Sequence, residues 1–285
     1  MTETVFRSFF VMPAISPIGV FDSGLGGLTV LKELVRRLPE LDFIYLGDNA
    51  RAPYGPRDFE TVYQYTLQAV QWLFDQGCPL VILACNTASA KALRTIQQKN
   101  LPLIDPSKRV LGVIRPTTEV IGDYTETLHI GILGTQGTVD SGSYLIEIQK
   151  SFPDVTVYQQ ACPAWVELVE SGEHLTPKAV EPVKACLDAL LQQCEGIDTI
   201  LLGCTHYPLL MPVIQKLVHP GVQIIAQGEI VAESLVSYLQ RHPEMAGRLS
   251  SNGTIRFYTT GDTEKFGQAA GIFWGEEVKA SKASL

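Results

Sequence analysis

The sequence predicts an α/β fold of two pseudo-symmetric domains, each built on a parallel sheet, with an active site in the cleft between them. Short β-branched runs alternate with longer amphipathic runs along the chain, which is typical of βαβ units with helices on both faces of a parallel sheet. The segments at 81–90 (VILACNTASA) and 18–30 (IGVFDSGLGGLTV) resemble those at 199–209 (TILLGCTHYPL) and 130–142 (IGILGTQGTVDSG) at similar offsets. This repetition suggests two duplicated halves.

The expected strands are short apolar runs, and the expected helices are the longer stretches between them. In chain order the strands are Ile18–Phe21, Asp42–Leu46, Leu80–Ala84, Val110–Ile114, His129–Leu133, Val155–Tyr158, Thr199–Leu202, Val222–Ala226 and Thr254–Thr259. The helices include Leu28–Leu38, Phe59–Phe74, Ala88–Lys99, Ser143–Ser151, Pro177–Gln193 and Pro212–Leu217. Ligands of such sheets bind beyond the carboxyl ends of the strands, so polar residues at those ends are candidate site residues.

Composition and charge exclude several classes of protein. With 285 residues, 46% hydrophobic and 18% charged, the chain can bury a sizeable core. A net charge of −8 argues against nucleic-acid binding, which needs a basic face. No apolar run reaches the ~18 residues that would span a membrane, and the N-terminal stretch MTETVFRSFFVMPAI does not read as a secretion signal.

The cysteine pattern predicts reduced thiols in a cytoplasmic protein. The six cysteines are Cys78, Cys85, Cys162, Cys186, Cys194 and Cys204. Disulfides belong mainly to secreted chains, and there is neither a Cys-x-x-Cys nor a His-Glu-x-x-His spacing. We therefore expect no metal site.

Two polar loops follow apolar strands in the first half of the chain. The stretch from Phe21 to Gly27 (FDSGLGG) is rich in glycine but does not complete a Gly-x-Gly-x-x-Gly motif, because Thr29 occupies the sixth position. This stretch could form a turn that lets a small ligand approach the backbone, or it could simply cap a helix. The loop 47–57 (GDNARAPYGPR) carries Arg51 and Arg57, which could hold carboxylates or could simply be solvated.

Cys85 and Cys204 each end an apolar strand, and each is expected to lie immediately before a helix. If the halves pack about a pseudo-twofold axis, the two thiols face each other across one cleft. Such a pair can remove a proton from one face of a carbon atom and return one to the other face. A helix N-terminus would favour the thiolate form.

Neighbouring polar groups fit that chemistry. Amides and side chains of Asn86, Thr87 and Thr205 could bind a substrate carboxylate. His206 could assist Cys204, and Asp22 could assist Cys85. The plainer alternative is that these residues cap helices or fill the core.

Five strings together resemble the glutamate racemase family, cofactor-independent members of the aspartate/glutamate racemase superfamily. They are FDSGLGGLTVLKEL, YLGDNARAPYG, ACNTASA, GILGTQGTVDSGSY and LLGCTHYPLL. The resemblance runs from about Ile18 to the FYTTGDTEKF segment near the C-terminus. It implies interconversion of L- and D-glutamate, with D-glutamate supplied to bacterial peptidoglycan. It also implies a discontinuous first domain, residues 16–110 and 223–285, with the second domain, 111–222, inserted into it.

The resemblance assigns roles to individual residues. Cys85 and Cys204 correspond to the two catalytic acid/bases, and Asp22, His206 and an acid after WVELVE (Glu167, Glu170 or Glu173, with Glu170 favoured) correspond to groups that tune the thiols. The substrate-binding residues implied are Asp22, Ser23, Tyr54, Gly55, Asn86, Thr87, Thr205 and His206. Thr117 and Thr118 stand where many relatives carry a small pair, so their hydroxyls could alter affinity if they line the pocket. The family commonly forms homodimers and uses no cofactor.

Three alternatives remain open from sequence. Aspartate racemase of the same superfamily also uses two cysteines, although DNARAPYG and CTHYPLL favour glutamate. A single-cysteine hydrolase could use Cys204 and His206, which would leave Cys85 unexplained. A regulatory role such as gyrase inhibition, reported for some relatives, has no visible signal. A pyridoxal enzyme would need a lysine at the site, yet Lys32 and Lys91 lie within expected helices.

Overall fold

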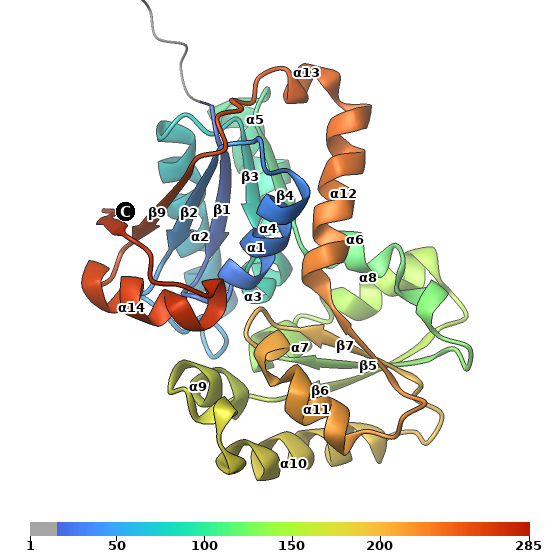
Figure 1. Cartoon of the computed structure of the whole chain (residues 1–285). Coiled ribbons are helices and arrows are strands. Elements are labelled where there is room, and N and C mark those ends of the chain that lie inside the picture. The colour runs from blue at the N-terminus through green and yellow to red at the C-terminus, as the bar shows by residue number, and fades with distance from the viewer. Residues whose placement is uncertain (1–15) are drawn as a thin grey trace, which may run out of the picture.

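The computed structural model describes residues 16–285 and contains two parallel sheets (Figure 1). The N-terminal stretch 1–15, where no secretion signal was recognised, lies outside the described residues. The larger sheet has the order β10-β9-β2-β1-β3-β4, with strands Ala280–Lys282, Ile255–Thr259, Phe43–Gly47, Ile18–Asp22, Leu80–Leu83 and Arg109–Gly112. The smaller sheet has the order β6-β5-β7-β8, with strands Thr156–Ala161, His129–Gly134, Thr199–Gly203 and Gln223–Ala226. The predicted α/β class with two parallel sheets is confirmed.

The two sheets share one strand order. In β2-β1-β3-β4, the strand that comes first in the chain, β1, pairs with β2 on one side and β3 on the other, and β4 pairs with β3. In β6-β5-β7-β8, β5 likewise pairs with β6 and β7, and β8 pairs with β7. β1 therefore corresponds to β5, and β3 to β7. Cys85 follows β3 and Cys204 follows β7, so the two cysteines occupy equivalent strand ends, as the internal similarity predicts.

Helices cover both sheets, and their apolar faces form the core. The longer ones are α1 (Leu28–Arg37), α2 (Phe59–Asp75), α8 (Ser143–Ser151), α10 (Val180–Leu191), α12 (Gln227–Arg241) and α14 (Thr263–Trp274). The shorter ones are α3 (Asn86–Lys91), α4 (Leu93–Thr95), α5 (Leu101–Ile104), α6 (Ile114–Thr118), α7 (Gln136–Asp140), α9 (Ala164–Glu170), α11 (Met211–Leu217) and α13 (Pro243–Ala246). Central strands such as β1, β2 and β7 are buried throughout, which explains their continuous apolar sequences.

The chain passes between the sheets twice. The first connection leaves β4 and reaches β5 through α6 and a 3₁₀ helix (Ile121–Tyr124). The second leaves β8 and returns through α12, which packs along α1 (Figure 1) with the exposed ion pairs Arg36–Glu229 and Arg37–Glu233. β8 pairs with β7, so the predicted boundary after residue 222 divides the smaller sheet. The domain division itself remains a prediction.

Three expected elements differ in the structure. The run Ala88–Lys99 is not one helix but α3, α4 and the start of a π-helix (Ile96–Asn100) that leads into α5. The strand expected to reach Ile114 ends at Gly112, and Ile114 begins α6. The α-helix expected directly after Cys204 is also wrong, because a 3₁₀ helix (Tyr207–Leu210) precedes α11. Pro212 has no N–H to donate to the carbonyl of Pro208, so an α-helix cannot run through this segment uninterrupted.

Candidate active site

Cys85 lies almost fully buried between β3 and α3. Its side chain is 5% exposed, and its thiol donates to Ser23 Oγ at 3.5 Å. Burial, with a further contribution from the charge of Asp22, raises the pKa of the thiol to about 12, although the hydrogen bonding with Ser23 opposes the shift. Cys85 is therefore a neutral thiol at neutral pH, ready to donate a proton.

Cys204 lies at the equivalent end of β7, beside a histidine. It is 6% exposed, and its Sγ is 3.9 Å from Nδ1 of His206. The other ring nitrogen of His206 lies 3.0 Å from Glu170 Oε1. Burial alone would lower the pKa of His206, but Cys204, Glu170 and Asp22 together raise it to about 10. The imidazole is therefore a cation at neutral pH.

Asp22 ends β1 and is buried near both groups. Burial raises the pKa of its carboxyl group, and the charge of His206 and the backbone N–H groups of Gly24 and Gly27 oppose that shift. Oδ2 accepts from Gly24 N at 2.9 Å, whereas Oδ1 is buried without a hydrogen-bond partner among residues 16–285. One oxygen of Asp22 thus remains free to accept from a ligand.

Loops from the two sheets contact each other at this point. Thr87 Oγ1 lies 2.9 Å from Thr135 Oγ1 and 3.5 Å from Thr138 Oγ1, which both follow β5. Asn86 Oδ1 accepts from the Tyr144 hydroxyl at 2.6 Å. These contacts join the loop after β3 in the larger sheet to the loop after β5 in the smaller one.

The loops after β1 and β7 form a second contact between the sheets. Thr29 Oγ1, in the first turn of α1, donates to the carbonyl of Thr205 at 2.9 Å. Gly26 lies so close that a Cβ added there would overlap both Thr205 Oγ1 and the His206 ring. The structure therefore brings Asp22, Ser23, Asn86, Thr87, Thr205 and His206 to the facing edges of the two sheets.

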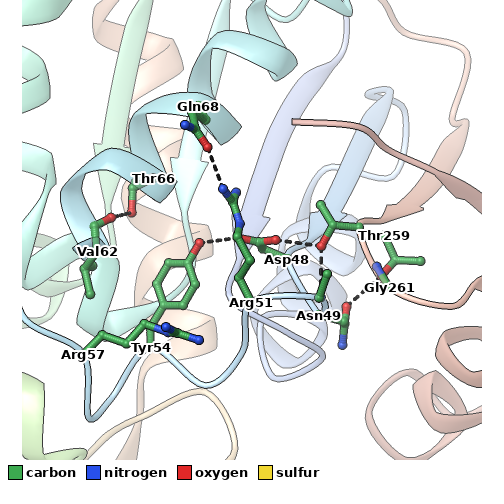
Figure 2. A network of polar contacts seen from close by, with 12 residues as sticks. Asp48, Asn49, Arg51, Tyr54, Arg57, Val62, Thr66, Gln68, Thr259 and Gly261 are labelled. Atoms are coloured by element: carbon green, nitrogen blue, oxygen red, sulfur yellow. Dashed lines mark hydrogen bonds and ion pairs between the residues drawn. The ribbon is translucent and has the colours of Figure 1, made fainter. Parts of the chain in front are cut away.

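The loop with Tyr54 and Gly55 reaches the same region through its backbone. The carbonyl of Gly55 accepts from Gly137 N at 3.0 Å, and a Cβ on Gly55 would lie 3.2 Å from Thr135 Cβ. Figure 2 shows that the Tyr54 ring points the other way, because its hydroxyl donates to Asp48. The Tyr54 side chain thus fixes the loop, and the backbone faces the smaller sheet.

The two arginines of this loop bind protein groups. Arg51 Nε donates to Asp48 Oδ2 at 2.7 Å, and its NH1 donates to Gln68 Oε1 at 2.5 Å (Figure 2). Arg57 Nε donates to the carbonyl of Pro53 at 3.1 Å. The carboxylate that Arg51 holds is therefore that of Asp48.

The remaining sequence candidates have other contacts. Glu173 pairs with Lys178 at 2.5 Å, so among the three acids considered, Glu170 is the one that contacts His206. Thr117 Oγ1 donates to the carbonyl of Val113 at 3.1 Å, and Thr118 Oγ1 to that of Arg115 at 3.0 Å. Sequence reasoning did not single out Thr135, Thr138, Tyr144 or Gln227. Thr135 follows β5 directly, and Thr138 lies in α7 just beyond it, so their position after a strand end was the available signal.

Both thiols are almost fully buried, and the best-formed pocket of the described residues lies elsewhere. A pocket of about 1060 Å³ between α1 and α12 is lined by residues such as Lys32, Arg36 and Glu229, and by neither cysteine. Within residues 16–285, no helix is long and apolar enough to cross a membrane, and no cluster of three His, Cys, Asp or Glu side chains could hold a metal.

We expect Glu170→Gln to lower the pKa of His206, because an amide keeps the hydrogen-bond acceptor but removes its negative charge. NMR titration of ¹³C-labelled histidine, assigned with His206→Gln, measures this directly. In the folded protein the pKa of His206 lies above that of a free imidazole, so the proton bound to His206 stabilises the fold at low pH. This stabilisation is lost as the pH rises through about 10. Glu167→Gln is the matched control, and an unchanged titration in Glu170→Gln would contradict the assignment.

Comparison with known proteins agrees with this geometry. The sequence profile described as Asp/Glu/Hydantoin racemase matches residues 18–235. A glutamate racemase of Ruegeria sp. (strain TM1040) is 43% identical over 92% of this chain and 97% of its own length.

Two crystal structures are also similar over nearly the whole chain. Glutamate racemase isoform RacE1 from Bacillus anthracis has a TM-score of 0.86 and 35% identity over 95% of this chain and 98% of that one. The glutamate racemase from Francisella tularensis in complex with D-glutamate has a TM-score of 0.83 and 32% identity over 94% and 97%.

Proposed function

This chain belongs to the Asp/Glu/Hydantoin racemase family and, within it, to the glutamate racemases, and from that premise we propose that Cys85 and Cys204 interconvert L- and D-glutamate as opposed acid/bases. The observation that carries the proposal is their placement at equivalent strand ends of two sheets with one strand order. The segment after Cys85 contacts the smaller sheet's side through Thr87 and Thr135, and the segment after Cys204 contacts the larger sheet's side through Thr205 and Thr29.

The protonation of the resting site suits a two-base reaction. One cysteine, as thiolate, takes the proton from Cα of glutamate and becomes a thiol. The other, as thiol, gives its proton to the opposite face of the resulting carbanion and becomes a thiolate. The raised pKa of Cys85 keeps it as the acid, and the positively charged His206 ring lies beside Sγ of Cys204, which we assign as the first base. After one turnover the two roles are exchanged.

We assign partners for the substrate's ammonium group and carboxylates at the same strand ends. The buried carboxylate of Asp22, with one oxygen free, is placed to accept from the substrate ammonium group. Asn86 Nδ2, the Thr87 and Thr205 hydroxyls, and the backbone at Ser23, Tyr54 and Gly55 are placed to bind its carboxylates. Glu170 holds the His206 ring in position. The reaction then uses side chains of the chain alone, and we propose no cofactor.

The wider role follows from the product. We propose that the enzyme acts in the cytoplasm as a homodimer and supplies D-glutamate for peptidoglycan. Its net charge of −8 gives no support for direct contact with nucleic acid.

A hydrolase centred on Cys204 is the second candidate, because His206 bridges Cys204 and Glu170 in the order of a catalytic triad. Against it, a hydrolase centred on Cys204 leaves Cys85 without a role, although Cys85 lies at the equivalent strand end of the other sheet. The relatives also favour racemisation of glutamate over that of aspartate.

The test is incubation of pyridoxal-free protein with L- or D-glutamate in deuterated water, followed by mass spectrometry and optical rotation. We expect loss of optical activity, with deuterium at Cα of the product enantiomer. Exchange of aspartate but not of glutamate would keep the mechanism and change the substrate. Absence of Cα exchange in both amino acids would overturn the racemase proposal.

A further inference from the structure

Gln227 is the first residue of α12 and lies in the second connection between the sheets. Its side chain is 4% exposed. Nε2 lies within hydrogen-bonding distance of three oxygens: the carbonyl of Val113 at 3.1 Å, Thr117 Oγ1 at 3.0 Å and the Tyr144 hydroxyl at 2.8 Å. Val113 belongs to the first connection between the sheets, so this amide ties the two connections together.

The hydrogen-bond partners fix which way the Gln227 amide points. The carbonyl of Val113 can only accept, so the group facing it must be the NH₂ and not the oxygen. Thr117 Oγ1 donates its own proton to the same carbonyl at 3.1 Å, so it too can only accept from Gln227. The NH₂ group has two protons for these three oxygens, and its shortest contact is the one to the Tyr144 hydroxyl, at 2.8 Å, so we assign Tyr144 as an acceptor from Gln227.

This orientation determines the polarity of the next two groups. Because the Tyr144 hydroxyl accepts from Gln227, its single proton is given to Asn86 Oδ1, at 2.6 Å. The Asn86 oxygen is thereby occupied, and Asn86 Nδ2 becomes the unpaired end of a hydrogen-bond relay that runs from Gln227 through Tyr144. Asn86 is 3% exposed, and Nδ2 is buried without a hydrogen-bond partner among the residues that the structure describes.

We propose that Gln227 is a positioning residue for glutamate binding: acting through Tyr144, it fixes the Asn86 side chain so that its NH₂ group donates to a substrate carboxylate. The inference rests on the proposed role of Asn86 in the active site. Without the donor at residue 227, the Tyr144 hydroxyl no longer has to give its proton to Asn86, and it can instead accept from Asn86 Nδ2. The inverted amide would present its oxygen to an anionic substrate and repel it.

The variant that tests this is Gln227→Met, which keeps the length of the side chain but removes the donor. We expect KM for both enantiomers of glutamate to rise about tenfold, the effect of losing one hydrogen bond to a charged group, with kcat within about threefold. Tyr144→Phe, which leaves the bonds of Gln227 to Val113 and Thr117 intact, is expected to raise KM similarly. Thr117→Val is the matched control: it removes a partner of Gln227 outside the relay, and KM should change less than twofold.

A double-mutant cycle separates a relay from independent packing defects. If Gln227 acts through Tyr144, then Gln227→Met should have no further effect on KM in the Tyr144→Phe background. Additive effects, or a rise in KM for Thr117→Val equal to that for Gln227→Met, would overturn the proposal. Should Gln227→Met not fold, Tyr144→Phe alone decides, because an unchanged KM there also overturns it.

Asn86→Ala keeps this inference distinct from the proposed function. If Asn86→Ala leaves KM unchanged, the role of Asn86 in binding is wrong, and the relay has no function. If Asn86→Ala raises KM while Gln227→Met and Tyr144→Phe do not, the binding role stands and only the relay is overturned.

Discussion

Replacement of either Cys85 or Cys204 by serine is expected to reduce racemisation at least about a thousandfold in both directions, with the fold retained. Each thiol performs one of the two proton transfers, and general acid/base groups contribute 10²–10⁴-fold each. Serine is close to cysteine in size, but its hydroxyl does not ionise in the range where a thiol does. Circular dichroism checks the fold, and polarimetry with each enantiomer measures the rate.

The two variants should differ in the exchange that remains. Each keeps one thiol, which can still remove and return the Cα proton of the one enantiomer whose proton faces it. In deuterated water, one variant should exchange L-glutamate and the other D-glutamate, both without racemisation. Complementary exchange would assign each cysteine to one face of the substrate, which the distances in the resting structure do not decide.

Cys186→Ser is the control, since Cys186 is a half-buried free thiol of α10, outside the loops that carry Cys85 and Cys204. We expect its activity to stay within about twofold of wild type, as for a surface substitution. Full racemisation by Cys85→Ser would instead show that Cys85 is not one of the two bases. Exchange of both enantiomers by one variant would show that a single base reaches both faces.

The strands were predictable because each central strand is buried on both sides, and so it reads as a continuous apolar run. Leu80–Leu83 and Thr199–Gly203 are examples. Helix continuity was not predictable in the same way. Ala88–Lys99 has good helix formers throughout, yet the chain breaks between α3 and α4 and widens to a π-helix, a local departure that periodicity does not encode.

Among the site residues, too, those marked by a local sequence pattern were predictable, and those that depend on tertiary contacts were not. Cys85, Asn86 and Thr87 could be found because each follows an apolar strand, and parallel strands end at one edge of a sheet. Tyr144 and Gln227 could not, because neither follows a pattern of its own. They matter through bonds to Asn86 and to Val113, and such pairings arise only when the two sheets are packed together.

Gly26→Ala is expected to reduce kcat/KM roughly a hundredfold. The Cβ would lie 2.6 Å from His206 Cε1, and closer still to Thr205 Oγ1 and His206 Nδ1, so the loop after β7 has to move. This loop carries Cys204, and displacement of a catalytic group by about 1 Å costs on the order of 10²-fold. The loss therefore reflects displaced catalytic groups and not a loss of backbone freedom, because Gly26 is not among the residues with positive φ.

Gly24→Ala is the matched control in the same turn. A Cβ there would lie 3.7 Å from Asn49 Nδ2 and 3.8 Å from Glu170 Oε1, which are ordinary contacts, and its backbone N–H to Asp22 is unaffected by the substitution. We expect its kcat/KM to remain within about threefold of wild type, in line with most mild substitutions. Equal losses in the two variants would mean that any side chain in this turn is harmful, whereas a loss confined to Gly26→Ala would show that the larger sheet positions Cys204 and His206 through this one contact.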